Sequence, residues 1–256
     1  MKHISWTVLF CLFTVSLIAQ DERPELVTDR PDQTESSVVV PRKSLQIETG
    51  ISLTNDEAEG AESRTISLAS TLLRYGLFEN AELRVGVNYD LLRVSQAIGD
   101  TSLQGFTPVD IGTKVYISEE DGFLPELALI ASLTMPYGSE EFRSKYMAPT
   151  LLLVASHTIS DNLGFGYNIG AWWDGENPQA QGKYSAALGW VPGDKLGMFA
   201  EIFGTFNSNS GAHAVDAGIT YLLAPNFQLD LSAGLALNSD ADDVFISAGF
   251  SWRIPN

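Results

Sequence analysis

The sequence predicts an all-β fold, a single antiparallel transmembrane β-barrel of about 12 strands that follows a cleaved signal peptide. Three observations predict it. The N-terminus is short and apolar, apolar and polar residues alternate repeatedly from residue 44 onward, and no later apolar run is long enough for a spanning helix. No charge run or Pro/Ser-rich stretch divides residues 44–254, so we expect one barrel domain over residues 44–256.

The N-terminus has the parts of a secretory signal peptide. Lys2 supplies the charge, residues 4–18 the apolar run, and Ala19 the small residue at the cleavage site, so we expect residues 1–19 to be removed. The run is shorter than the about 20 apolar residues that span a bilayer. Cys11 is the only cysteine and lies in this run, so the mature chain has no disulfide and no thiol chemistry.

Alternation with period two predicts the strands. In residues 227–237 the odd positions are Phe, Leu, Leu, Ala, Leu and Leu, and the even positions are Gln, Asp, Ser, Gly and Ala. A soluble exported barrel or sandwich with an apolar core would alternate in the same way. Strand length favours the membrane barrel, because soluble strands average about five or six residues and spanning strands need about nine to eleven. The expected strands are 44–54, 63–75, 81–93, 108–118, 125–136, 147–158, 163–174, 182–191, 196–206, 213–223, 227–238 and 244–254.

The connections alternate between short turns and mostly longer polar loops, as in barrels with short periplasmic turns and longer external loops. An even number of strands places both ends of the barrel domain on the periplasmic side. The short connections are 76–80, 119–124, 160–162, 192–195 and 224–226. The external loops are 55–62, 94–107, 137–146, 175–181, 207–212 and 239–243.

Aromatic residues gather near both ends of the expected strands, which is typical of the two girdles of a membrane barrel. The alternative is that aromatic residues simply favour strands. The periplasmic group is Tyr75, Phe78, Phe165, Trp190, Tyr221, Phe227, Phe250 and Trp252. The external group is Tyr89, Trp172, Trp173, Tyr184, Phe206 and Phe245.

Charge and motif content exclude several functions. The net charge of -17 argues against a nucleic-acid partner, because phosphates attract basic surfaces. Neither Gly-x-Ser-x-Gly nor His-Glu-x-x-His occurs, and the mature chain has two histidines, so we expect no enzyme, no cofactor and no metal site. The remote alternative is an outer-membrane lipid hydrolase, for which His213 beside Ser208 and Ser210 is the candidate.

Strand parity places eight acids and three bases on the face expected to line the lumen. An acid-rich lumen favours cations, because acids focus a negative potential in a narrow channel. The alternative is a closed lumen in which these charges pair across the barrel. The acids are Glu48, Glu82, Asp90, Asp110, Glu126, Glu201, Asp216 and Asp230, and the bases are Arg84, Lys114 and Arg253.

Residues 20–43 lack the alternation and contain three prolines. They form either a periplasmic tail or a plug that folds into the lumen. Because lumen acids outnumber lumen bases, we expect a plug to pair Arg30 with lumen carboxylates. The other candidate plug residues are Asp29, Asp32 and Glu35.

The stretch TDRPDQTESS at residues 28–37 opens a set of motifs that also includes LQIETG at 45–50, LRYGL at 73–77 and DAGITYLL at 216–223. With GFSWR at 249–253, these motifs resemble a bacterial outer-membrane family catalogued under the meta-pathway of phenol degradation and often labelled transporter. The resemblance covers essentially the whole mature chain and implies a barrel with an export or transport role. Barrels of this kind often end on an aromatic residue, whereas this chain ends Ile-Pro-Asn.

These observations predict a passive channel or transporter for small solutes in the bacterial outer membrane. The lumen charges predict cations as the solute, and the family resemblance predicts hydrophobic or aromatic compounds. The alternative is a closed structural or lipid-interacting barrel without conductance. The expected partners are outer-membrane lipid and lipopolysaccharide, an unidentified solute, and the barrel assembly machinery, which would read Phe250 or Trp252.

Overall fold

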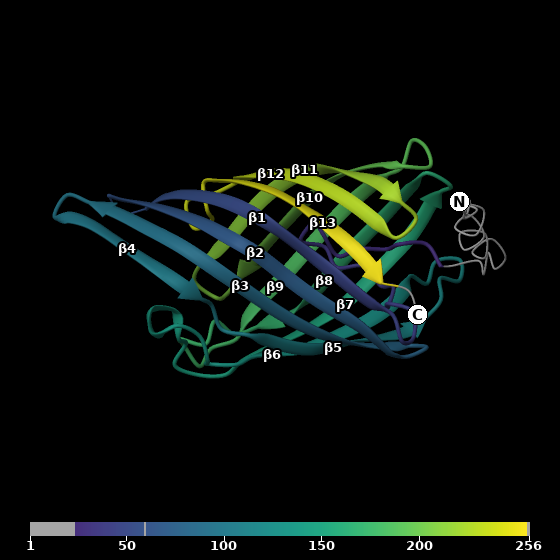
Figure 1. Cartoon of the computed structure of the whole chain (residues 1–256), viewed down its shortest axis with the longest axis horizontal. Coiled ribbons are helices and arrows are strands. Elements are labelled where there is room, and N and C mark those ends of the chain that lie inside the picture. The colour runs from purple at the N-terminus through teal and green to yellow at the C-terminus, as the bar shows by residue number, and fades with distance from the viewer. Residues whose placement is uncertain (1–23, 59, 255–256) are drawn as a thin grey trace, which may run out of the picture.

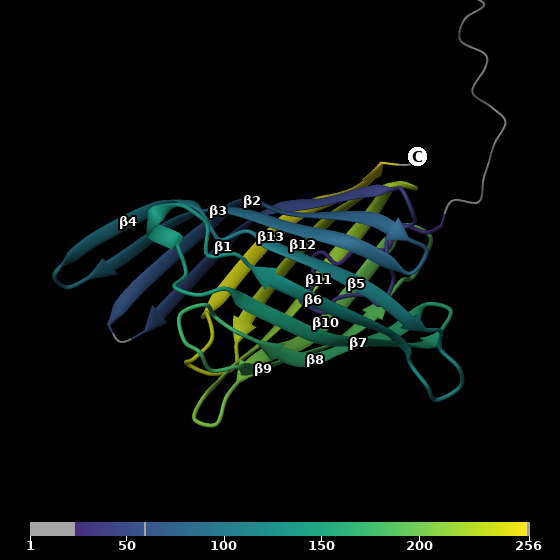
Figure 2. The same cartoon turned by 90° about the horizontal axis from the view of Figure 1, so that it is seen from below.

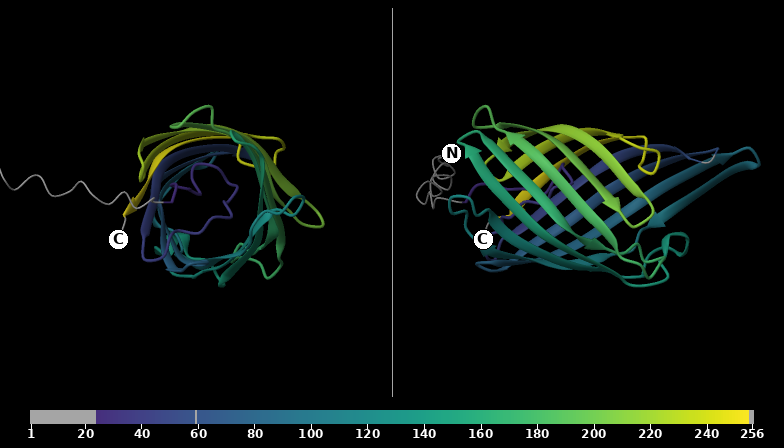
Figure 3. Two further views of the ribbon diagram at one scale, coloured as in Figure 1. Left: turned by 90° about the vertical axis from the view of Figure 1, so that its right-hand side faces the viewer. Right: turned by 180° about the vertical axis from the view of Figure 1, so that it is seen from behind.

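The protein is a closed antiparallel β-barrel in a computed structural model that describes residues 24–58 and 60–254. The sheet closes because β2 pairs with β1 on one side and with β3 on the other. Figures 1 and 2 show the barrel from the side, and Figure 3 adds a view along it. No helix in these described residues is long and apolar enough to cross a membrane. The expected signal peptide, residues 1–19, lies outside the described residues.

The wall consists of strands, and one short 3₁₀ helix, Glu140–Phe142, lies in the loop over residues 135–147. Most strands are long enough to cross a bilayer at a tilt. The strands are β1 (Leu45–Ala58), β2 (Ala61–Phe78), β3 (Ala81–Gln96), β4 (Gly99–Phe106), β5 (Asp110–Ser118), β6 (Glu126–Thr134), β7 (Ala148–Ser160), β8 (Leu163–Trp172), β9 (Gln181–Trp190), β10 (Leu196–Phe206), β11 (Gly211–Ala224), β12 (Phe227–Ala236) and β13 (Val244–Ile254).

The described strands fill twelve positions around the barrel, as expected, because β4 and β5 share one position. β3 pairs with β4 through residues 89–96 and with β5 through residues 81–86. The sequence prediction of an external loop over 94–107 is therefore wrong in part, since β3 and β4 continue as a hairpin beyond the barrel (Figure 1). β4 was missed because its sequence, GDTSLQGF, has few apolar residues and shows no clear alternation.

On most strands the apolar face points outward and the polar face points into the barrel; β6 and β7 also carry apolar residues on the inward face, where Ala128, Ile130, Leu152 and Val154 form a buried cluster. On β12, Leu231 is 47% exposed whereas its neighbour Ser232 is 2% exposed. A soluble barrel would have the opposite arrangement, so the soluble alternative is excluded. An exposed apolar belt around a closed sheet is the surface that lipid covers in a transmembrane barrel.

The barrel has two distinct ends. Leu45 at the start of β1 pairs with Ile254 at the end of β13, so the barrel wall starts and finishes at the same end, which we call periplasmic. The β3–β4 hairpin marks the opposite, external end (Figure 2). At the periplasmic end Phe227 stacks on Phe250, with ring centroids 5.5 Å apart.

The expected external girdle is corrected at two positions. Tyr89 packs edge-on against Phe106 at this end, with ring centroids 5.1 Å apart. Trp172 and Phe245, however, line a cavity inside the barrel. Their height along the strand suggested the girdle, but their strand parity turns both rings inward.

Lipid exposure of Leu231 gives the first prediction. Leu231→Arg should cost about 2–4 kcal/mol near the membrane midplane, because the lipid face tolerates charge poorly. Ser52→Arg is the matched control, since Ser52, Ser247 and Ser232 form one cross-strand row and Ser52 lines the internal cavity. Refolding titrations in lipid vesicles measure both costs. Equal costs would mean that the two faces are assigned wrongly.

Candidate functional site

Residues 24–43, which we call the inner segment, fold into the barrel from the periplasmic end (Figure 3). Their backbone amides donate hydrogen bonds to carboxylates of the wall. Asp29 N donates to Glu48 at 3.0 Å, and Val40 N donates to Glu82 at 2.6 Å. A segment without regular structure leaves amides unpaired, and the buried wall carboxylates accept from them.

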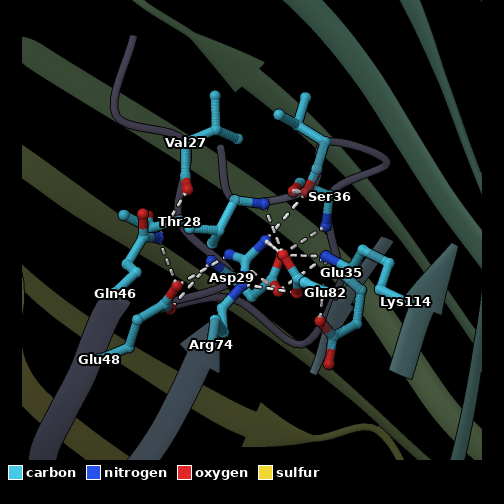
Figure 4. A network of polar contacts seen from close by, with 12 residues as sticks. Val27, Thr28, Asp29, Glu35, Ser36, Gln46, Glu48, Arg74, Glu82 and Lys114 are labelled. Atoms are coloured by element: carbon cyan, nitrogen blue, oxygen red, sulfur yellow. Dashed lines mark hydrogen bonds and ion pairs between the residues drawn. The ribbon is translucent and has the colours of Figure 1, made fainter. Parts of the chain in front are cut away.

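The inner segment and four strands meet in a buried group of charges, which we call the ion cluster (Figure 4). The Arg74 guanidinium lies 2.9 Å from Glu48, 2.8 Å from Glu82 and 3.0 Å from Asp29. Burying charges is costly unless each finds partners, and here each has several. The cluster consists of Asp29 and Glu35 from the segment, Glu48 from β1, Arg74 from β2, Glu82 and Arg84 from β3, and Lys114 from β5.

Asp29 is the point where the segment joins these strands. Its carboxylate accepts from Lys114 Nζ at 2.8 and 2.9 Å and from Arg84 Nη1 at 2.5 Å. Arg84 also binds Glu35 of the segment at 2.7 Å. Asp29 and Glu35 of the segment therefore form ion pairs with the positive charges of the wall.

Arg74 is the cluster residue that strand parity missed. Counting every second residue along 63–75 places Arg74 outward, but the structure buries it completely. The β2 register shifts between Leu68 and Thr71, and Ala69 there has a φ of 52°. This bulge inserts a residue and reverses the alternation, so Arg74 points into the barrel. The charged residue within the apolar stretch TLLRYG was the available signal.

Arg30 forms the carboxylate pair that was expected for it. Its Nη2 lies 2.9 Å from Asp230 and 3.0 Å from Ser247. Gly50 and Gly249 pair across β1 and β13 beside it. A Cβ at Gly50 would lie 2.4 Å from Arg30 Nη2, and one at Gly249 would lie 2.5 Å from it, so these glycines provide the space for the guanidinium.

The rest of the segment binds the opposite wall. Thr34 donates to Glu201 at 2.6 Å, and Glu35 N donates to Asn168 Oδ1 at 2.7 Å. Ser37 donates to Glu126. Thus Glu126 and Glu201, like Glu48 and Glu82, bind the segment.

The remaining predicted residues lie elsewhere in the interior. Asp90 accepts from Asn88 at 2.6 Å, and Asp110 accepts from Thr134 at 3.0 Å, so both have hydrogen bonds within the wall. Asp216 is buried opposite Glu201 in the β10–β11 pair. Arg253 donates to the Glu25 carbonyl at 3.0 Å, near the start of the inner segment.

A cavity of about 540 Å³ lies on the external side of the segment. Its floor is Arg30, Pro31, Asp32 and Gln33. Its walls include Trp172, Lys183, Phe203 and Phe245, and the loop residues Asp240 and Asp242 also line it. A second cavity of about 310 Å³ is lined by Arg30, Glu48, Asn88 and Asp110, so Arg30 borders both spaces.

The external loop and the histidines add little chemistry. Partial desolvation, with Asp56 and Asp243 nearby, raises the pKa of Asp242 above its usual range. Tyr184 Oη lies 3.0 Å from His213 Nδ1, while the Ser210 hydroxyl lies 3.3 Å from Asn207. Among the described residues, no group of three or more His, Cys, Asp or Glu is placed to hold a metal ion.

An apolar exterior, a polar interior and a closed sheet of spanning strands define a transmembrane β-barrel of the bacterial outer membrane. The chain belongs to the family described as "Putative MetA-pathway of phenol degradation", which matches residues 28–254. This match includes most of the inner segment together with the complete wall. A comparison with curated proteins finds no match.

Solved structures share the fold at low identity. An outer membrane channel from Pseudomonas putida F1 is 12% identical over 84% of this chain and 97% of that chain, with a TM-score of 0.66. The β-domain of the Bordetella autotransporter BrkA is 12% identical over 82% and 98%, with a TM-score of 0.54. The translocator domain of the autotransporter NalP from Neisseria meningitidis is 11% identical over 84% and 90%, with a TM-score of 0.52.

The burial of Arg74 gives the second prediction. Arg74→Met should lower the free energy of unfolding by about 3–5 kcal/mol, because it leaves buried carboxylates without their counter-charge. Arg42→Met is the control, since Arg42 forms an exposed pair with Glu79 at 3.8 Å and should cost about 0–1 kcal/mol. Urea unfolding of the refolded proteins measures both. A cost for Arg74→Met as small as that of the control would contradict a stabilising role for the cluster.

Proposed function

We propose that the protein is a passive outer-membrane channel for small solutes and that the inner segment narrows its lumen. The observation that carries this proposal is the cavity of about 540 Å³ on the external side of the segment. A small barrel can fill its own interior with side chains. Here the external half keeps a space lined by charged, polar and aromatic groups, as a path for solutes requires.

The inner segment sets the narrowest part of this path. It is held mainly by hydrogen bonds and ion pairs to the wall, with one isolated bridge between Arg42 and Gly76. The buried ion cluster keeps it in place, and the two cavities that border Arg30 offer a route beside it. We therefore propose that solutes pass beside a fixed segment.

The composition of the larger cavity suggests two solute classes. Its three carboxylates, Asp32, Asp240 and Asp242, outnumber the cations Arg30 and Lys183 and favour cationic solutes, since carboxylates attract positive charge in a confined space. The rings of Trp172 and Phe203 offer apolar surface for a hydrophobic or aromatic solute. The name of the Pseudomonas putida structure, an outer membrane channel, supports the transport role, and the names of the structures compared describe no enzyme.

The second candidate function is a closed structural barrel without conductance. The observation that favours it is the ion cluster, which fills part of the lumen with paired charges. In either case we propose that the assembly machinery reads Phe250 or Trp252 of β13. Phe250 faces outward, because its cross-strand partner Leu229 is exposed on the outer surface.

The third prediction concerns conductance. Deleting residues 20–37 should raise the single-channel conductance in planar bilayers, and Arg30→Ala should raise it less, because both enlarge the narrow region. Unchanged conductance in both variants would contradict a limiting role for the segment. No conductance in any form would favour the closed barrel.

A disulfide tether provides the control for a deletion that fails to fold. Thr34 Oγ1 lies 2.9 Å from Ser185 Oγ, so Thr34→Cys with Ser185→Cys can link the segment to β9. The expected mature chain has no other cysteine. If solutes pass beside a fixed segment, oxidation should leave conductance unchanged. If oxidation abolishes conductance and a reductant restores it, the segment must move for solutes to pass.

The fourth prediction concerns ion preference. Asp240→Asn with Asp242→Asn should weaken cation preference, as reversal potentials in a salt gradient would report. Because the pKa of Asp242 is raised, its share should be lost on acidification at a higher pH than for an ordinary aspartate. Asp194→Asn, in the exposed turn before β10, is the matched control. Anion preference in the unmodified protein would remove the electrostatic argument.

A further inference from the structure

Two arginines on the outer face of the barrel differ from every other arginine or lysine on the described strands. The other arginines and lysines on strands point inward, where they are buried or line the cavity. Arg64 on β2 and Arg93 on β3 are exposed and lie directly opposite each other. The inward bases are Arg74, Arg84, Lys114, Lys183 and Arg253.

The two arginines lie at the outer border of the apolar belt. The last apolar outward row at the external end joins Leu53, Ile66 and Leu91 across β1, β2 and β3. Two residues farther along the strands, Arg64 and Arg93 begin the polar surface. In a membrane barrel, lipid head groups replace acyl chains where the apolar belt ends.

In the described residues, one ion pair reaches the two guanidinium groups. Side chains directly opposite in an antiparallel pair have Cβ atoms about 4.5–5.5 Å apart, and like charges there are destabilising. Asp100 binds Arg93 at 2.5 Å. No ion pair of Arg64 occurs among residues 24–58 and 60–254. An anion between the two guanidinium groups would remove the repulsion.

The surface around the pair fits a phosphorylated glycolipid. Arg64 and Arg93 line a groove of about 700 Å³ together with Ile66, Ser102 and Gln104. Guanidinium groups bind phosphate oxygens with two parallel hydrogen bonds. The hydroxyl of Ser102 and the amide of Gln104 can bind sugar hydroxyls, and Ile66 can contact an acyl chain.

We propose that Arg64 and Arg93 bind a phosphate group of lipopolysaccharide at the external rim of the barrel. Lipopolysaccharide is the phosphorylated glycolipid of the outer leaflet, and its phosphates lie directly above its acyl chains. The arginine pair lies directly above the apolar belt, so the two layers match. This site depends on the membrane location of the barrel and not on conductance.

The test compares phosphorylated with dephosphorylated lipopolysaccharide. Protein refolded in lipid-free detergent is titrated with each, and binding is measured by native mass spectrometry. The unmodified protein should bind the phosphorylated form more tightly. Arg64→Gln with Arg93→Gln should weaken that binding about tenfold or more and leave binding of the dephosphorylated form unchanged, since hydrogen bonds to charged groups contribute about 1.5–3 kcal/mol.

Two controls separate the site from general electrostatics. Arg143→Gln removes an exposed positive charge from the external 137–147 loop and should not change the affinity. Asp100→Asn frees Arg93 and should strengthen binding. Equal binding of both lipopolysaccharide forms, or an equal loss with Arg143→Gln, would overturn the proposal.

Stability in detergent shows whether a variant loses lipopolysaccharide binding only because it misfolds. Without lipopolysaccharide, Arg64→Gln with Arg93→Gln should be at least as stable as the unmodified protein, because it removes the like-charge pair. With lipopolysaccharide, the unmodified protein should gain stability and the double variant should gain little. The same gain in both proteins would also overturn the proposal.

Discussion

The interior of the barrel depends on one requirement, that buried charges have partners. Arg74, Arg84 and Lys114 bring positive charge to one side of the lumen, and Glu48 and Glu82 balance part of it. The inner segment supplies Asp29 at the centre of these contacts. Wall and segment therefore stabilise each other, because removing either would leave ions buried without counter-charges.

Period-two alternation predicted the barrel well because each spanning strand has one face against lipid and one against a polar interior. β12 shows this most clearly, with exposed leucines alternating with buried polar residues. The same rule failed where the backbone departs from a regular strand. A bulge at Ala69 reversed the parity of Arg74, and the polar sequence of β4 gave no apolar signal. The orientation of Arg74 and the existence of β4 both depend on backbone pairing, which the alternation of residue types does not report.

The site was predictable in part. An excess of acids at lumen-facing positions indicated that a counter-charge was needed, and Arg30 does meet Asp230. Charge counting could not show that Glu48, Glu82 and Glu201 accept hydrogen bonds from backbone amides of the segment. Those contacts depend on the path of an irregular segment in three dimensions. The cavity likewise depends on where that path leaves space, so no sequence pattern reports it.

The contacts of the inner segment also constrain the order of folding. Arg30 and Asp230 are 200 residues apart in the chain, and Thr34 and Glu201 are 167 apart. The segment is made before the wall, yet it cannot complete its contacts until the last strands are present. Contacts between distant residues carry a high entropic cost and form slowly. Docking of the segment is therefore a late event, and until then water must solvate the charges of the lumen.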